Sequence, residues 1–243
     1  MGLTQSVLFC HPPRRIHLDG FQRKLESNIQ SFFTALDSTF QWNDIRRVSP
    51  IINPMQKRVF LIHGWDGKPT GNWFPYLSLE LKANGFEVNA PQMQHAGEPK
   101  VKEWLDFLKD YVGKPDKETY FVGHSLGCIA IARYLETLPH KAKIGGAVFV
   151  AGFSGRINVP EIAEFYSLPF NPEKAKMHSD NFVMIFSDND DYVPMEKSLE
   201  MAKQFGAKTI LERGKGHFQA NQGVTTLPSA LSALLKMNGV NKV

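Results

Sequence analysis

Short apolar runs alternate with amphipathic segments from about residue 58 to the C-terminal region. We expect strands at residues 59–63, 86–90, 119–123, 144–151, 181–187 and 208–212. Helical spacing fills the gaps, at about 73–84, 102–111, 126–138, 196–205 and 227–236. Strands that alternate with helices are typical of a parallel sheet covered on both faces. With right-handed crossovers, the pattern predicts a three-layer α/β domain with strand order 2-1-3-4-5-6.

The first 57 residues follow a different pattern. Apolar residues recur there at steps of three and four: Leu18, Phe21, Leu25, Ile29, Phe32, Leu36 and Phe40. This stripe predicts one amphipathic helix that packs on the following domain or on a second subunit, with contact to a membrane surface as the alternative. Two prolines in residues 48–55 indicate a linker. We therefore expect an extension at 1–57 and a catalytic domain at 58–243.

Composition narrows the function classes. The net charge of +4 comes largely from the first 57 residues, so the rest of the chain carries no concentrated basic stripe and nucleic-acid binding is not expected. Two cysteines, no long apolar segment and no signal-peptide core favour a cytoplasmic protein. Met1-Gly2 and Ser6 match a permissive myristoylation pattern, which leaves lipidation open. The oligomeric state also stays open.

A G-x-S-x-G sequence, Gly123-His-Ser-Leu-Gly127, follows the apolar run at 119–122. In a sharp strand-to-helix turn, the glycines avoid collisions with the neighbouring strand and helix, while the serine adopts a strained backbone conformation that exposes its hydroxyl. Ser125 is therefore the candidate nucleophile. A free serine is a weak nucleophile, so this interpretation requires an acid and a histidine later in the chain.

Both partners occur in the required order. Asp190 follows the fifth expected strand, and His217 lies in a glycine-containing loop after the sixth. His217 would accept the proton of Ser125 as general base, and Asp190 would hold the imidazole tautomer and stabilise the imidazolium. The neighbouring Asp188 and Asp191 are interpreted as solvated residues that cap the next helix.

Acyl transfer also needs donors for the developing oxyanion. The backbone N–H groups of Leu126 and Trp65 are the candidates, because one opens the helix after the nucleophile and the other follows the first strand of this domain. His63 and His124 are interpreted as structural. No metal motif occurs among the remaining histidines, and this chemistry needs no metal or other cofactor: His11, His17, His95, His140 and His178.

The chain resembles the α/β-hydrolases, and among them the small serine hydrolases of the retinoblastoma-binding-protein and YdeN type. The resemblance covers about residues 58–236 and is carried by Ile62-His-Gly-Trp65, Asn72-Trp-Phe-Pro75, the G-x-S-x-G sequence, Ser187-Asp-Asn-Asp-Asp-Tyr-Val-Pro194 and Gly216-His-Phe218. It implies that Ser125, Asp190 and His217 form the triad, and that only a short insert follows the fourth strand. The L-x-C-x-E motif for retinoblastoma protein is absent.

Within that insert, at about 153–180, Phe165, Tyr166 and Phe170 are the candidate pocket residues, although aromatic clusters are more often core. A short insert predicts a shallow site for small acyl groups. We therefore expect a serine hydrolase that cleaves small carboxylic esters through an acyl-enzyme intermediate. Thioesterase or amidase activity with the same triad is one alternative, and an interaction module that retains a hydrolase fold is another.

Overall fold

The computed structural model describes residues 56–239. The expected amphipathic helix at 18–40, the linker and the lipidation pattern at Met1 fall outside the described residues, so these stay predictions, as does a domain boundary at residue 57. No helix within 56–239 is long and apolar enough to cross a membrane.

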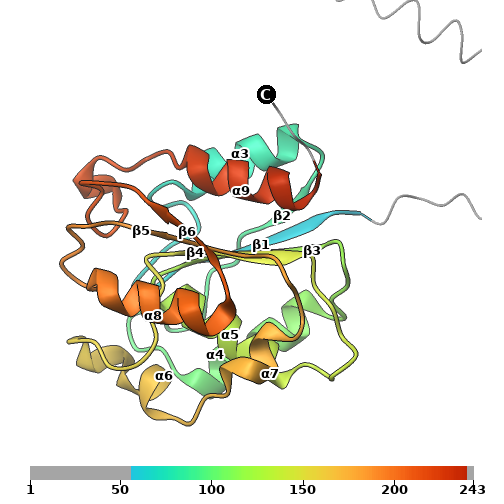
Figure 1. Ribbon diagram of the computed structural model, residues 1–243, viewed down its shortest axis with the longest axis horizontal. Coiled ribbons are helices and arrows are strands. Elements are labelled where there is room, and N and C mark those ends of the chain that lie inside the picture. Colours follow the sequence, from blue (N-terminus) through green and yellow to red (C-terminus); the bar gives the residue numbers. More distant parts are fainter. Residues whose placement is uncertain (1–55, 240–243) are drawn as a thin grey trace, which may run out of the picture. The chain divides into compact units, whose positions relative to one another are not determined.

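A six-stranded parallel sheet forms the centre of the domain (Figure 1). Its order is β2-β1-β3-β4-β5-β6, as predicted, and all five neighbouring pairs are parallel. The strands are β1 (Arg58–Ile62), β2 (Glu87–Asn89), β3 (Thr119–His124), β4 (Gly146–Val150), β5 (Phe182–Phe186) and β6 (Lys208–Leu211). Because all strands run the same way, the loops after β1, β3, β5 and β6 meet at one edge.

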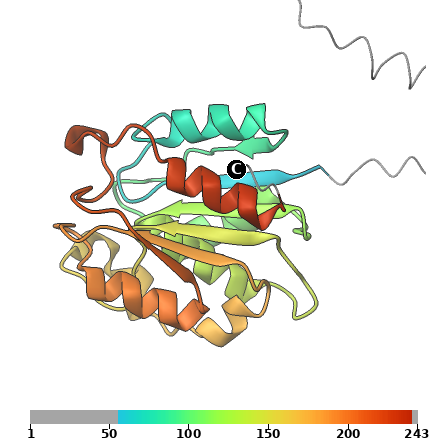
Figure 2. The same cartoon turned by 45° about the horizontal axis from the view of Figure 1, so that its top comes forward.

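Helices cover both faces of the sheet, which confirms the predicted layers (Figures 1 and 2). The five predicted helices are α3 (Phe74–Ala83), α4 (Val101–Val112), α5 (Leu126–Thr137), α8 (Met195–Phe205) and α9 (Pro228–Met237). A proline in the first turn of α3 and α9 favours the start of each helix, and Gly206 ends α8 in the left-handed conformation.

Alternate residues of the central strands enter two separate cores. Tyr120 and Val122 of β3 belong to the core that includes residues of α3 and α9, whereas Phe121 belongs to the core that includes residues of α4, α5 and α8. All of β3 is consequently buried. This explains why the strand reads as a continuous apolar run instead of alternating with polar residues.

The insert between β4 and β5 contains three short helices that the sequence analysis did not predict. These are η1 (Pro160–Ile162), α6 (Ala163–Ser167) and α7 (Pro172–Lys176). Segments of three to five residues are too short to show a helical period, so tertiary contacts decide their conformation.

Arg133, near the C-terminal end of α5, binds this insert to the rest of the domain through hydrogen bonds. Its guanidinium donates three hydrogen bonds to backbone carbonyls of the insert, at Phe165 (2.8 Å), Leu168 (2.7 Å) and Pro169 (3.1 Å). The side chain is buried, and the guanidinium lies 5.6 Å from the ring centre of Phe170. A planar group with several donors suits this arrangement because it can serve carbonyls that point from different directions.

We expect Arg133→Lys to lower the free energy of unfolding by about 2 kcal/mol, because one ammonium group cannot serve all three buried carbonyls. Urea denaturation measures the change. Arg156→Lys, at an exposed position of the same insert, is the matched control and should leave stability unchanged. Equal effects of the two substitutions would contradict the role of Arg133.

Candidate active site

Ser125 occupies the sharp turn between β3 and α5. Its φ of 54° and ψ of −120° lie in a region that non-glycine residues rarely adopt, and its N–H donates to the carbonyl of Val150 at 2.8 Å. A Cβ at Gly123 would lie 2.7 Å from the Cys128 nitrogen, and one at Gly127 would lie 2.1 Å from the Ile62 carbonyl oxygen. The strained serine and the steric role of both glycines are therefore confirmed.

His217 and Asp190 form a shielded pair. The Nδ1–H of His217 donates to Asp190 Oδ2 at 2.8 Å, with Oδ1 at 3.0 Å, and the two side chains are 6% and 2% exposed. Asp190 Oδ1 also accepts the backbone N–H groups of Tyr192 and Val193, each at 2.9 Å. Since little water reaches the pair, its attraction is screened far less than that of a surface ion pair.

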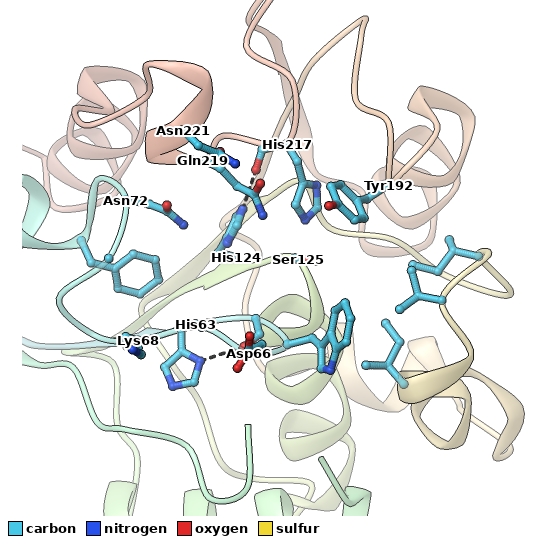
Figure 3. A pocket seen from close by; sticks show the side chains of 18 residues that line it. His63, Asp66, Lys68, Asn72, His124, Ser125, Tyr192, His217, Gln219 and Asn221 are labelled. Carbon is cyan, nitrogen blue, oxygen red and sulfur yellow. Dashed lines mark hydrogen bonds between the residues drawn. The ribbon is translucent and has the colours of Figure 1, made fainter. Parts of the chain in front are cut away.

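Ser125 and His217 border one cavity of about 460 Å³. Figure 3 shows His124, Ser125, His217 and Tyr192 grouped around it. Within the described part of the chain, neither Ser125 Oγ nor His217 Nε2 makes a hydrogen bond, so the hydroxyl and this ring nitrogen are both open to the cavity. Catalytic contacts of this kind are often long without substrate and shorten in the reacting complex.

His124 links the serine turn to the histidine loop. Its Nε2–H donates to the backbone carbonyl of His217 at 2.8 Å, and the two rings lie 5.0 Å apart. Burial lowers the pKa of His124 to about 3, so the ring is neutral at physiological pH. His124 therefore acts as a hydrogen-bonding residue, in agreement with the structural role predicted for it.

His63 holds the loop after β1 in place. Its Nδ1–H donates to the carbonyl of Gly64 at 2.8 Å, while Nε2 accepts the N–H of Met93 at 2.9 Å, and burial lowers its pKa. Neither ring nitrogen is available as a base, in agreement with the structural role predicted for His63.

The loop after β1 passes close to Ser125. A Cβ at Gly64 would lie 3.0 Å from Ser125 Cβ and 3.5 Å from the Leu126 nitrogen, and Trp65 follows directly. Leu126 opens α5, so its N–H has no acceptor within the helix. The two predicted oxyanion donors thus belong to adjacent segments, and their role stays a prediction.

The predicted pocket residues lie elsewhere. Phe165, Tyr166 and Phe170 do not border the cavity next to Ser125, and line a separate cavity of about 50 Å³ between α5, the insert and α8. This corrects the expectation from sequence. The aromatic side chains pack on α5 and α8, so they serve as core, which is the more common role of such clusters.

Other apolar residues line the cavity next to Ser125, and they were not predicted from the sequence: Ile157, Val159, Ile162 and Tyr192. The first three precede or lie within η1, at a spacing that follows no regular period, so only the folded insert reveals their common direction. Tyr192 could have been noticed, because it lies two residues after the predicted acid.

The structure also changes the interpretation of Asp188. This side chain does not cap α8; it accepts the N–H of Gly214 at 2.9 Å and pairs with Arg213 at 3.0 Å. Asp191 is exposed. No three His, Cys, Asp or Glu side chains within residues 56–239 form a group that could hold a metal ion.

Comparison with known proteins assigns the chain to a family. The sequence pattern of the serine hydrolase family matches residues 59–236. The chain belongs to this family. It is 34% identical to YdeN of Bacillus subtilis (strain 168) over 181 residues, which are 74% of this chain and 95% of YdeN. It is 26% identical to the serine hydrolase RBBP9 of Rattus norvegicus over 153 residues, which are 62% and 80% of the two chains.

Solved structures agree with this assignment. The crystal structure of the Bacillus subtilis ydeN gene product has a TM-score of 0.73 at 33% identity and covers 76% of this chain and 100% of that one. Est1E of Butyrivibrio proteoclasticus has the same fold, with a TM-score of 0.60 at 16% identity over 78% and 92% of the two chains. The chain is thus an α/β-hydrolase of the YdeN and RBBP9 type, and an enzyme of the hydrolase class.

The buried neutral state of His124 predicts a pH dependence of stability. The unfolded chain binds a proton at this histidine below its ordinary pKa of 6.5, whereas the folded chain does not until about pH 3. The associated stability is complete above pH 6.5 and decreases, as the pH falls, by about 1.4 kcal/mol per pH unit.

His124→Gln provides the matched comparison, because the glutamine Nε2–H can donate to the same carbonyl but does not titrate. Urea unfolding of both proteins from about pH 7.5 to 4.5 should show a smaller loss of stability in the variant. Parallel pH dependences would contradict a buried neutral His124.

Proposed function

We propose that this hydrolase cleaves small carboxylic esters through an acyl-enzyme intermediate, with Ser125 as nucleophile, His217 as general base and Asp190 as the acid. The observation that carries the proposal is the buried His217–Asp190 pair beside a strained serine, with Ser125 and His217 on the same cavity. A solvated surface pair would not support it, because it would neither fix the imidazole nor strengthen its charge interaction.

The reaction would proceed in two steps. Ser125 Oγ attacks the ester carbonyl and passes its proton to His217 Nε2; His217 then gives this proton to the departing alcohol, and the acyl-enzyme forms. Water attacks the acyl-enzyme with His217 again as base, the carboxylic acid leaves, and the proton returns to Ser125. In both steps Asp190 accepts the hydrogen bond from Nδ1–H and stabilises the imidazolium.

The backbone N–H groups of Trp65 and Leu126 are proposed to bind the oxyanion. The contacts at Gly64 support this role, because they bring the loop after β1 against the start of α5. Such preorganised donors stabilise charge that develops in the transition state, and a single one contributes about 3 kcal/mol in acyl-transfer enzymes.

The cavity supports a small substrate. Its volume of about 460 Å³ lies toward the lower end of the range for ligand pockets. Ile157, Val159 and Ile162 provide an apolar side for the acyl group, whereas Asn72 and Gln219 provide amides. Short acyl chains should therefore react faster than long ones.

Ser125→Ala should lower kcat for a short acyl ester by at least about 10⁴-fold, because no other group replaces the nucleophile. The wild-type protein should also form a covalent adduct with a fluorophosphonate, and the variant should not. Mass spectrometry of the labelled protein gives the site. A folded wild-type protein that is not labelled would contradict the proposal and favour an interaction module.

A panel of matched ester, thioester and amide substrates identifies the leaving group that the enzyme prefers.

Single Asp to Asn substitutions at 188, 190 and 191 test the choice of acid. Asp190→Asn should reduce kcat/KM by about 10³- to 10⁴-fold, because the amide no longer stabilises the imidazolium. Asp188→Asn keeps an acceptor for Gly214 and should have a small effect, and Asp191→Asn should have none. Equal losses in the three variants, measured as steady-state kinetics, would rule out Asp190 as the specific partner.

A further inference from the structure

The loop that carries His217 has little regular support of its own. It follows β6 and includes Gly214 and Gly216, whose φ values of 69° and 53° lie in the left-handed region. Residues 213–215 are exposed. Glycines of this kind give a free loop many accessible conformations, so other contacts must hold the base in one of them.

Those contacts come from side-chain oxygens, one for each of four successive backbone N–H groups. Gly214 donates to Asp188 Oδ1 (2.9 Å), Lys215 to Ser187 Oγ (3.0 Å), Gly216 to Asn189 Oδ1 (2.8 Å) and His217 to Gln222 Oε1 (2.7 Å). None of these four N–H groups donates to a backbone carbonyl of a strand or helix within the described residues. The conformation of the histidine loop therefore depends on particular side chains.

Three of the four acceptors come from one segment, residues 187–189, which directly precedes Asp190. Residues 187–190 thus bind the histidine loop in two ways: residues 187–189 accept hydrogen bonds from its backbone, and Asp190 accepts one from the imidazole. The loop that carries Asp190 and the loop that carries His217 are therefore hydrogen-bonded to each other along their length. A shift of one loop relative to the other would break several of these hydrogen bonds together.

Asn189 lies at the centre of this pairing. Its Oδ1 accepts both the N–H of Gly216 and the hydroxyl of Ser187, at 2.8 Å each, and Gly216 directly precedes His217. The hydroxyl of Ser187 in turn accepts the N–H of Lys215, and Ser187 is 1% exposed. The ion pair between Asp188 and Arg213 is more exposed and contributes less to holding the histidine loop, because solvent screens the attraction between the two charges.

We infer that Asn189, supported by Ser187, is a positioning residue that places His217 for proton transfer from Ser125. This inference rests on the proposed function, since it assigns His217 as the base. Asn189 does not border the cavity and touches no reacting group; it acts by fixing the backbone one residue before His217. A displacement of the base by about 1 Å is enough to cost about a hundredfold in rate.

Three variants test the inference. Asn189→Leu removes the acceptor, whereas Asn189→Asp keeps an Oδ1 in the same place and serves as the conservative replacement. Asp191→Asn is the control, because Asp191 lies in the same loop, is exposed and makes no hydrogen bond within residues 56–239. The readouts are kcat and KM for a neutral short acyl ester, the thermal midpoint, and the low-field proton resonance of the His217 Nδ1–H.

For Asn189→Leu we expect kcat to fall by about 10- to 100-fold with KM changed by less than about threefold, because the substrate cavity is intact and only the base is displaced. The Nδ1–H resonance should broaden or shift. Asn189→Asp should restore the resonance and recover kcat to within about fivefold of wild type, and Asp191→Asn should match wild type.

The inference would be overturned if Asn189→Leu kept the wild-type kcat and resonance, if its loss of activity merely followed the fraction of unfolded protein, or if Asn189→Asp failed to restore both. A failure of the proposed function looks different: the wild type would not react with the fluorophosphonate or turn over the ester. In that event the resonance and its response to the variants still report on the loop pairing alone.

Discussion

The contact between the start of α5 and the end of β1 is the constraint on which the site depends. At Gly127 there is no room for a Cβ, because it would lie 2.1 Å from the Ile62 carbonyl oxygen. This close approach holds Ser125 at a φ of 54°, and the hydrogen bond to Val150 holds it from the other neighbouring strand. The cost of the strained residue is offset by the buried sheet around it, where β3 is covered on both faces.

The other half of the site depends on polar contacts in addition to the packing of the buried Phe218. The His217 loop is bound by side-chain oxygens of residues 187–190 and by Gln222, and His124 adds a hydrogen bond from the serine turn to the His217 carbonyl. Ser125, Asp190 and His217 thereby come from three separate loops at one edge of the sheet, yet each loop is bonded to at least one of the others. This cross-connection gives a site with an open cavity a fixed geometry.

The residues that line the cavity could not be predicted from the sequence. Phe165, Tyr166 and Phe170 were expected to line the pocket, but Arg133 binds the carbonyls around them and directs these side chains toward α5 and α8. The smaller Ile157, Val159 and Ile162 line the cavity that Ser125 borders. No local pattern carries that information, because a short irregular insert obtains its direction from contacts with distant residues.

The sequence by itself determined the order and parallel arrangement of the strands, the five longer helices and the turn at Ser125, because apolar periodicity and glycine placement are local signals that a buried sheet and a sharp turn require. It also placed Asp190 and His217 after the correct strands. Only the tertiary structure decided the shielding of their pair, the pairing of the two loops through Ser187 and Asn189, and the choice of cavity walls. Those features depend on residues far apart in the chain, such as Asn189 and Gly216, which are 27 positions apart, and only folding brings them together.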